Sequence, residues 1–397
     1  MRKILVHKFV NLFLFGVLST CSIEIAVAQI PPPPGEDPAV LAQAATDAEP
    51  QPAGVNASTG AKQPRGSIVI APLPIVSPAI GAGIVPVFGY IFPFQVKDKI
   101  SPPSVLGVAG LLTDNGTHAL VLMSDLFMKE NRYEIRSFYF HGALNYDLYG
   151  EGYEAGTSNL RLPLEQQGQL FSVYFLRNIR WNVFAGPHFV TGNSTITVKP
   201  TSEEAPAAPQ DAGVKTNLTA LGLEVLRDSR PNRFYPETGS LVDFTADFFA
   251  KDLGSKYSYQ SYHFTFNKYW SVGRQQVLAY NLFGCATGGE APFYGKCIYG
   301  TSSELRGYTA GRYLDEYMFA TQLEYRVALP WRLGLTGFGG LGGVASEANK
   351  FRANQFLPAG GTGIRFLLNR KFNVNLRTDF AWGKDNFTWS VSVGEAF

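Results

Sequence analysis

The sequence predicts an all-β protein, a 16-stranded antiparallel transmembrane β-barrel. Long runs of the chain alternate between apolar and polar residues, the period of a strand with one apolar and one polar side. Aromatic residues make up 14% of the chain, and many lie at the ends of these runs, as in the interfacial girdles of outer-membrane barrels. The polar sides carry charges, which favour a wet lumen over the apolar interior of a soluble β-sandwich. These charged residues are Glu324, Arg326, Arg377 and Asp379.

The predicted strands are long enough to cross a membrane. The clearest alternating runs cover residues 240–250, 317–329 and 372–383. Each has about ten residues or more, the length at which a tilted strand spans the hydrocarbon core. Counting such runs between turn signals, from about residue 79 onward, gives 15 or 16. Because a single-chain bacterial barrel has an even number of strands, we expect 16, and one barrel domain occupies residues 67–397.

The first 28 residues have the features of a secretion signal. Arg2, Lys3 and Lys8 form a basic start, residues 9–18 are apolar, and the sequence AVA at 26–28 is a small-residue cleavage site. A lipoprotein signal ending at Cys21 is the alternative, although threonine is a poor residue before a lipidated cysteine. We therefore expect an exported protein from which residues 1–28 are removed.

The exported chain is expected to begin with a disordered periplasmic tail. Residues 29–66 are rich in Pro, Ala and Gln and hold almost no aromatics, so they bury too little apolar surface to fold. Residues 199–213 have the same composition and are predicted to be a mobile loop. The signal takes three of the 34 basic and one of the 32 acidic residues, which leaves 31 of each. This neutral balance argues against nucleic acid as a partner.

The uncharged stretch 68–94 resembles a transmembrane helix by hydropathy alone. Its prolines oppose a helix, because each costs about 3 kcal/mol in a helix interior. They are Pro72, Pro74, Pro78, Pro86 and Pro93. We therefore expect a leading segment, followed by a first strand that begins near residue 79.

Four motifs in a consistent order resemble the outer membrane protein 85 (Omp85) superfamily, the BamA/TamA/FhaC-like barrels with the bacterial surface antigen domain. They are DSRPNRFYPETGS (228–240), LRGY (305–308), QLEYRVAL (322–329) and the C-terminal FTWSVSVGEAF. In that family the first motif is the turn before the ninth strand, and LRGY is the tip of a long sixth extracellular loop folded into the lumen. The third motif is the next strand, and the last carries a signal for barrel insertion, here Trp389, Gly394 and Phe397. The resemblance covers about residues 79–397.

Two departures from the family pattern are visible. Most members carry periplasmic POTRA domains before the barrel, and the tail 29–66 is too short and too polar for one, so we expect a short form. A patatin-like phospholipase domain is also missing, because no G-x-S-x-G occurs. The family's inner-wall motif Phe-x-Asp-x-Gly on strand thirteen is represented by Phe338, Gly340 and Gly342. Gly340 therefore replaces the aspartate that receives the loop arginine in relatives.

The resemblance implies that Leu305, Arg306, Gly307 and Tyr308 form a lumenal loop tip. Since Gly340 offers no acceptor, the expected partners of Arg306 are the inward-facing Glu324 and Asp379. A charge-assisted contact of this kind would fix the loop inside the pore. The alternative is an exposed ion pair with Glu304 or Asp315, which contributes about 0–1 kcal/mol.

The seam between the first and last strands is predicted to be poorly paired. Pro86 and Pro93 lack an N–H for the ladder, and Gly81, Gly83 and Gly89 weaken the same segment. Missing ladder bonds are costly in hydrocarbon, where no water replaces them. We therefore expect a seam that opens sideways.

No cofactor, metal site or enzymatic activity is predicted. The sequence GFGGLGG (337–343) contains G-x-G-x-x-G, but no helix pattern follows it, so small residues making room for the loop explain it better. The histidines show no ligand spacing, and no Ser/His/Asp arrangement is evident from the sequence. Cys285 and Cys297 are the cysteines that remain after export, and an oxidising compartment would permit a disulfide between them.

Two functions from different classes remain open. The first is an outer-membrane barrel for protein assembly or translocation, which acts through its seam or lumen without covalent chemistry. The second is a passive pore or structural barrel that has lost the substrate-handling domains. The expected partners are outer-membrane lipid, the barrel assembly machinery for the protein's own insertion, and outer-membrane or secreted proteins as candidate substrates. The expected location is the bacterial outer membrane.

Overall fold

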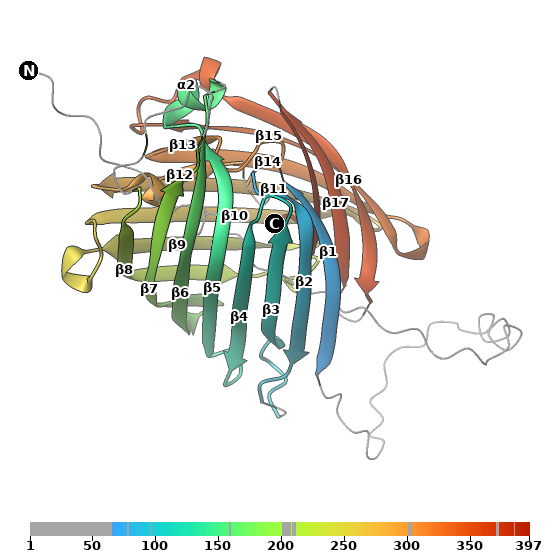
Figure 1. Ribbon diagram of the computed structural model, residues 1–397. Coiled ribbons are helices and arrows are strands. Elements are labelled where there is room, and N and C mark those ends of the chain that lie inside the picture. The colour runs from blue at the N-terminus through green and yellow to red at the C-terminus, as the bar shows by residue number, and fades with distance from the viewer. Residues whose placement is uncertain are drawn as a thin grey trace, which may run out of the picture.

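The computed structural model describes residues 66–77, 79–95, 97–158, 160–200, 208, 212–300, 304–370, 373–384 and 386–397. Sixteen strands form one antiparallel sheet in which each strand pairs with the next along the chain, and the sheet curls into a barrel (Figure 1). The predicted signal 1–28, nearly all of the tail 29–66 and most of the loop 199–213 lie outside these residues. The prediction of 16 strands is confirmed.

The strands of the barrel wall are 8 to 19 residues long. They are β1 (Ser67–Ser77), β2 (Gly81–Phe92), β3 (Ser104–Thr113), β4 (His118–Met128), β5 (Tyr133–Leu148), β6 (Leu162–Arg180), β7 (Val183–Val198), β8 (Lys215–Asp228), β9 (Gly239–Phe249), β10 (Tyr259–Gly273), β11 (Gln276–Gly289), β14 (Tyr317–Ala328), β15 (Leu333–Ala345), β16 (Leu357–Asn369), β17 (Val374–Gly383) and β18 (Asn386–Val393).

The remaining elements are short and lie in the connections. They are helix α2 (Gly152–Thr157), strands β12 (Cys297–Tyr299) and β13 (Tyr313–Asp315), and the 3-10 turns η1 (Lys251–Leu253), η2 (Phe293–Gly295), η3 (Pro330–Arg332) and η4 (Ala353–Gln355). In the part of the chain that is described, no helix combines the length and the apolar character needed to cross a membrane.

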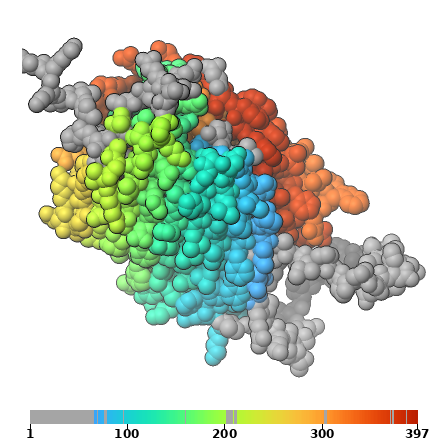
Figure 2. Space-filling model, viewed as in Figure 1, coloured from blue at the N-terminus to red at the C-terminus, as the bar shows by residue number. Residues whose placement is uncertain are grey.

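The alternation of the sequence becomes an apolar outside and a polar inside. On β14, Leu323 and Tyr325 are 48% and 41% exposed, whereas Glu324 and Arg326 are buried inside the barrel. Strand β17 follows the same pattern, with Trp382 outside and Asp379 inside. Figure 2 shows β1 to β8, coloured blue to yellow-green, side by side as one continuous outer surface.

The lengths of the connections give the barrel its orientation. At one end most neighbouring strands are joined by tight turns such as Trp181–Asn182, where both residues have the left-handed backbone that hairpin turns require. The long connections at the other end carry α2, β12 and β13 (Figure 1). Outer-membrane barrels have short periplasmic turns and long extracellular loops, so α2 lies at the extracellular end.

The predicted start of the barrel is wrong. Residues 67–77 form β1, which pairs with β2 along its whole length, so they are not a leading segment. The segment expected to be the first strand is therefore the second. The residues from which a weak seam was predicted lie on it or directly after it, so they are not at the seam: Gly81, Gly83, Pro86, Gly89 and Pro93. The prolines misled the prediction, because Pro72 lies directly opposite Pro86 at a position where neither residue has to donate to the other. An edge strand tolerates proline there.

Candidate functional site

The connection between β11 and β14 is the sixth loop at the extracellular end and folds into the barrel. Cys285 on β11 and Cys297 on β12 form a disulfide with a Cα–Cα distance of 5.7 Å, which fastens the first part of this loop to the wall. β12 then pairs with β13 in a small separate sheet. Between these two strands the chain reaches the LRGY tip, where Leu305 is completely buried.

Arg306 at the loop tip binds side chains of two barrel strands. Its Nη2 pairs with Glu324 on β14, and its Nη1 lies 2.8 Å from Oδ2 of Asp379 on β17. Nε and Nη2 also donate to Oε1 of Gln322, each at 3.1 Å. Because Arg306 is only 3% exposed, the alternative of a solvent-exposed ion pair on the outer loop surface does not describe it.

The same carboxylates hold further arginines of the wall. Arg326 donates from Nε to Glu324 at 2.6 Å, and Arg365 on β16 donates to Asp379, also at 2.6 Å. Arg377 approaches Asp379 at 3.8 Å. Asp379 and Glu324 are therefore shared between the loop and the wall. Removing one partner from such a network leaves a buried charge uncompensated, so the loop position depends on the shared carboxylates.

Glycines in the wall and at the tip allow the loop to approach. A side chain at Gly340 would meet Leu305 Cδ1 at 2.7 Å and would also meet the backbone oxygen of Thr321. One at Gly342 would meet the ring of Tyr299 at 2.6 Å. Gly307 has φ +116°, a conformation that other residues rarely adopt. Gly340 thus provides space for the loop tip.

Two aromatic residues complete the seat of the loop tip. The guanidinium of Arg306 lies 3.4 Å from the centre of the Phe338 ring, a cation–π contact in addition to its ion pairs. The hydroxyl of Tyr308 donates to the carbonyl of Pro358 at 2.7 Å and accepts the backbone N–H of Lys384 at 2.9 Å.

The C-terminal residues do not share one face. Trp389 lies on the outside of β18, where its ring stacks on Phe380. At Gly394 the backbone has φ +83°, and the chain beyond it enters the lumen. Phe397 packs there against a cluster that contains Tyr269, and its backbone oxygen accepts a hydrogen bond from Arg326 at 3.0 Å.

The sequence did not indicate three members of this network. Gln322 looked like an ordinary polar residue of β14, and Arg365 lies on a strand that was not among the clearest runs. Glu395, beside the terminal turn, binds Arg365 at 2.8 Å. No signal in the sequence shows that Gly394 turns the C-terminus inward, although the alternation of β14 already placed Gln322 on the face of Glu324.

A second buried group joins a serine, a histidine and an aspartate from three strands. Ser172 Oγ lies 2.9 Å from Nε2 of His188, and Nδ1 of His188 lies 2.7 Å from Oδ1 of Asp247. Gly222 lies between His188 and Asp247, and any side chain there would collide with the Asp247 carboxylate. The order of contacts is that of a catalytic triad.

The surroundings of Ser172 favour a structural role for this group. Ser172 lies in the middle of β6, in register with Phe138 on one side and Val190 on the other. Its neighbouring N–H groups therefore belong to the ladder and are not available as the donors that an acyl-transfer site needs. In the described part of the chain, no group of three or more His, Cys, Asp or Glu side chains has an arrangement that could hold a metal ion.

The sheet has two ends, and they lie beside each other. β1 and β18 are in contact, but among the described residues no ladder pair joins them. Pro72 and Pro86 lie opposite each other and have no N–H to exchange, so their backbone groups face away from the β1–β2 ladder. The backbone nitrogen of Pro72 thus faces the β18 side of β1. Pro74 lies two residues further on, so its backbone nitrogen faces the same side. The loop site and this seam are the two features that a function must explain.

Comparisons with known proteins agree with this architecture. Residues 181–397 match the model of the Omp85 superfamily domain. No curated protein sequence matches the chain. BamA from Haemophilus ducreyi lacking POTRA domains 1–3 is similar, with a TM-score of 0.52 and 14% identity over 83% of this chain and 70% of that one. CdiB from Acinetobacter baumannii has a TM-score of 0.52 and 12% identity over 83% of this chain and 65% of its own.

At such low identity the two solved structures establish the fold alone, and the chain spans less than two thirds of CdiB. The family is established by the domain match, which covers more than half of the 397 residues. The protein is an integral β-barrel of the outer membrane, and it belongs to the Omp85 superfamily.

Proposed function

We propose that this barrel inserts or transfers other polypeptides at the outer membrane by opening the seam between β1 and β18, without covalent chemistry. The observation that carries the proposal is the end of the hydrogen-bonded sheet at these two strands. Every other pair of neighbouring wall strands is joined by a ladder. In hydrocarbon, where water cannot replace missing bonds, the seam is the place where the wall separates at the lowest cost.

The composition of β1 supports this proposal. Pro72 and Pro74 remove two N–H donors from the edge that faces β18. β18 is the shortest strand of the wall, at eight residues, and its ladder with β17 ends at Val393. An incoming strand with all its donors would form a better ladder with either edge than the two edges form with each other.

The alternative of a passive pore is less well supported. A pore needs an open lumen, and the loop tip fills the lumen with buried side chains such as Leu305, Arg306 and Tyr308. The ion pairs of Arg306 with Glu324 and Asp379 oppose withdrawal of that loop. A route through the wall leaves this network in place, which favours the seam over the lumen.

Crosslinking tests the seam. Each variant carries one cysteine among residues 70–74 of β1 and one among residues 388–392 of β18. The pair of cysteines that crosslinks completely is used to close the seam. We expect closure to stop insertion of an unfolded outer-membrane protein into vesicles, and reduction to restore it. The control places the pair Tyr325→Cys and Gly337→Cys across the intact β14–β15 ladder, where the residues lie opposite each other. Full activity with a closed seam would refute the proposal.

Depletion separates the two functions in cells. If the protein assembles other barrels, its removal lowers the amounts of other outer-membrane proteins while their synthesis continues. A passive pore or structural barrel predicts unchanged amounts and altered uptake of small solutes. The measurement is quantitative proteomics of outer-membrane fractions after depletion.

A further inference from the structure

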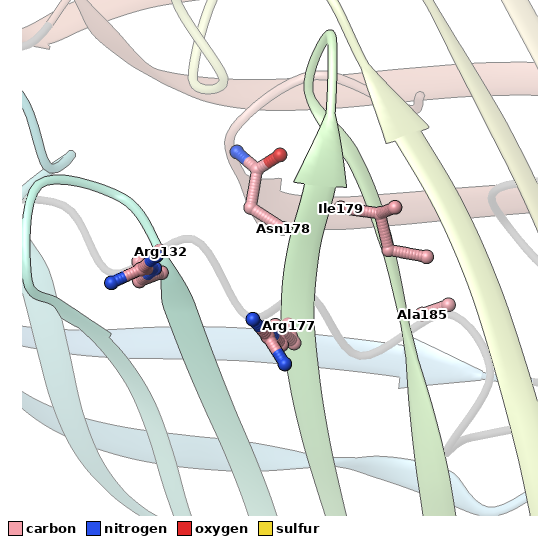
Figure 3. A pocket seen from close by; sticks show the side chains of 5 residues that line it. All are labelled: Arg132, Arg177, Asn178, Ile179 and Ala185. Carbon is pink, nitrogen blue, oxygen red and sulfur yellow. The ribbon is translucent and has the colours of Figure 1, made fainter.

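A recess with two unpaired arginines lies at the periplasmic end of the wall, far from the loop site. It has a volume of about 580 Å³ and is lined by Arg132, Arg177, Asn178, Ile179 and Ala185 (Figure 3). Arg132 follows the β4–β5 turn, Arg177 to Ile179 are near the end of β6, and Ala185 is near the start of β7. Both neighbouring turns are short, which places the recess at the periplasmic interface.

The recess faces lipid rather than the lumen. On β6, Leu176 points inward and is completely buried, whereas Phe175 and Ile179 on the opposite face are 48% and 69% exposed. Arg177 shares the outward parity of Phe175 and Ile179 and lies opposite Ala185 of β7. Since side chains alternate along a strand, the Arg177 guanidinium emerges on the membrane side.

In the part of the chain that is described, the two arginines have no anionic partner. Among the described residues, neither Arg132 nor Arg177 forms an ion pair or a side-chain hydrogen bond. Arg132 and Arg177 are both exposed. A guanidinium carries its charge at every physiological pH and presents a fork of donors that fits phosphate oxygens. Two of them in one recess repel each other until an anion lies between them.

The backbone fixes Arg132 beside Arg177. Lys129, Glu130 and Asn131 all have left-handed φ angles, which make the β4–β5 turn tight. The Asn178 amide donates to the carbonyl of Asn131 at 3.1 Å, and the Asn178 N–H donates to the carbonyl of Arg132 at 2.8 Å. The turn is thus tied to the end of β6, and the backbone of the two arginines is held in place before any ligand arrives.

Interfacial aromatics and further cations surround the recess. Trp181 is 74% exposed. The guanidinium of Arg180 lies over the Trp181 ring, 4.3 Å from the ring centre. Lys129 lies 5.5 Å from the ring centre of Tyr133. Exposed Trp and Tyr mark the level of lipid head groups, and basic residues there attract anionic lipids.

We propose that this recess binds the phosphate of a phospholipid head group in the periplasmic leaflet. Arg132 and Arg177 hold the phosphate oxygens by charge-assisted hydrogen bonds. Ile179 and Ala185 form an apolar wall beside them that the start of the acyl chains contacts. The apolar wall and the membrane-facing position select a lipid over free phosphate, which has no apolar part to bury.

Native mass spectrometry of the detergent-solubilised full chain tests this site with phosphatidylglycerol as the probe. We expect the double variant Arg132→Gln/Arg177→Gln to bind the lipid about tenfold more weakly, because it loses two charge-assisted hydrogen-bond donors. The matched control is Arg352→Gln in the extracellular β15–β16 connection, with unchanged binding expected. Heat-modifiability in gels verifies that each variant is folded. If the double variant does not fold, each single variant is expected to lose about threefold.

Two further probes identify the source of the phosphate. Diacylglycerol lacks the phosphate. We expect it to bind the wild-type protein no more tightly than phosphatidylglycerol binds the double variant. Inorganic phosphate is expected to displace phosphatidylglycerol only at a large excess. Equal binding of diacylglycerol, displacement by an equal concentration of phosphate, or an unaffected double variant would each overturn the proposal.

Discussion

At the scale of single residues, Arg306 explains how a charge can lie deep inside a membrane protein. It never meets lipid, because the loop carries it into the lumen, where Glu324, Asp379 and Gln322 accept its hydrogen bonds. Since such a network loses stability sharply when one partner is removed, the loop and the wall are energetically coupled at this point.

Removal of the arginine should release the loop. In Arg306→Ala, Glu324 and Asp379 lose a partner, and we expect a loss of about 3–5 kcal/mol in stability. The variant should also show larger single-channel conductance in planar bilayers, because the loop tip no longer fills the lumen. Arg352→Ala in an exposed loop is the control. A variant with the wild-type conductance and unfolding midpoint would contradict the plugging role.

The glycine at position 340 gives a second prediction at this scale. Gly340→Ala places a methyl group against Leu305 and the Thr321 backbone, so we expect the loop tip to be displaced and to become sensitive to protease. Gly337→Ala on the same strand is the matched control, because nothing lies within 4 Å of its added carbon. Equal protease resistance of the two variants would show that the loop does not need the space.

At the scale of elements, the loop depends on its disulfide and the seam on its prolines. Cys285 and Cys297 are separated by 12 residues, and closing such a loop contributes about 2–4 kcal/mol. We expect Cys285→Ser/Cys297→Ser to lower the urea midpoint of unfolding accordingly, and reduced wild-type protein to behave like the variant. An unchanged midpoint in both would mean that the packing of β12 alone holds the loop.

The prolines of β1 should keep the seam weak. In Pro72→Val/Pro74→Val two N–H donors return to the β18 edge, so we expect higher thermal stability and slower insertion of a substrate protein. Pro187→Val in β7, far from the seam, is the control and should leave insertion unchanged. If the melting temperature rises but insertion is as fast as in the wild type, the strength of the seam does not control activity, and the prediction is wrong.

The elements also show how far sequence reasoning reaches. Strands such as β14 and β17 could be predicted because lipid on one side and water on the other impose strict alternation. β1 was missed because its prolines break that pattern, and only its pairing with β2 shows that they lie at tolerated positions. Family resemblance predicted that Arg306 lies in the lumen, and the alternation of β14 and β17 supplied its partners Glu324 and Asp379. Glu395 and the Ser172–His188–Asp247 group depend on a chain reversal and on contacts across strands, which no local pattern encodes.

At the scale of the whole molecule, the barrel combines a firmly closed lumen with a weakly closed wall. The loop network joins the extracellular loop to β14, β16 and β17, and Glu395 extends it to the segment after β18. One edge of the seam is thus tied to the lumenal network, while the other edge, β1, is held by its ladder with β2 alone among the described residues. We therefore expect β1 and β2 to move when the seam opens.

Distance measurement by double electron–electron resonance tests this account most directly. Spin labels are placed at Ala71 on β1 and Ser390 on β18, and a control pair at Tyr325 and Gly337 spans the β14–β15 ladder. The account predicts that an unfolded outer-membrane protein shifts the β1–β18 distances to longer, broader values and leaves the control pair unchanged. A single narrow β1–β18 distribution that stays the same during substrate insertion would contradict it.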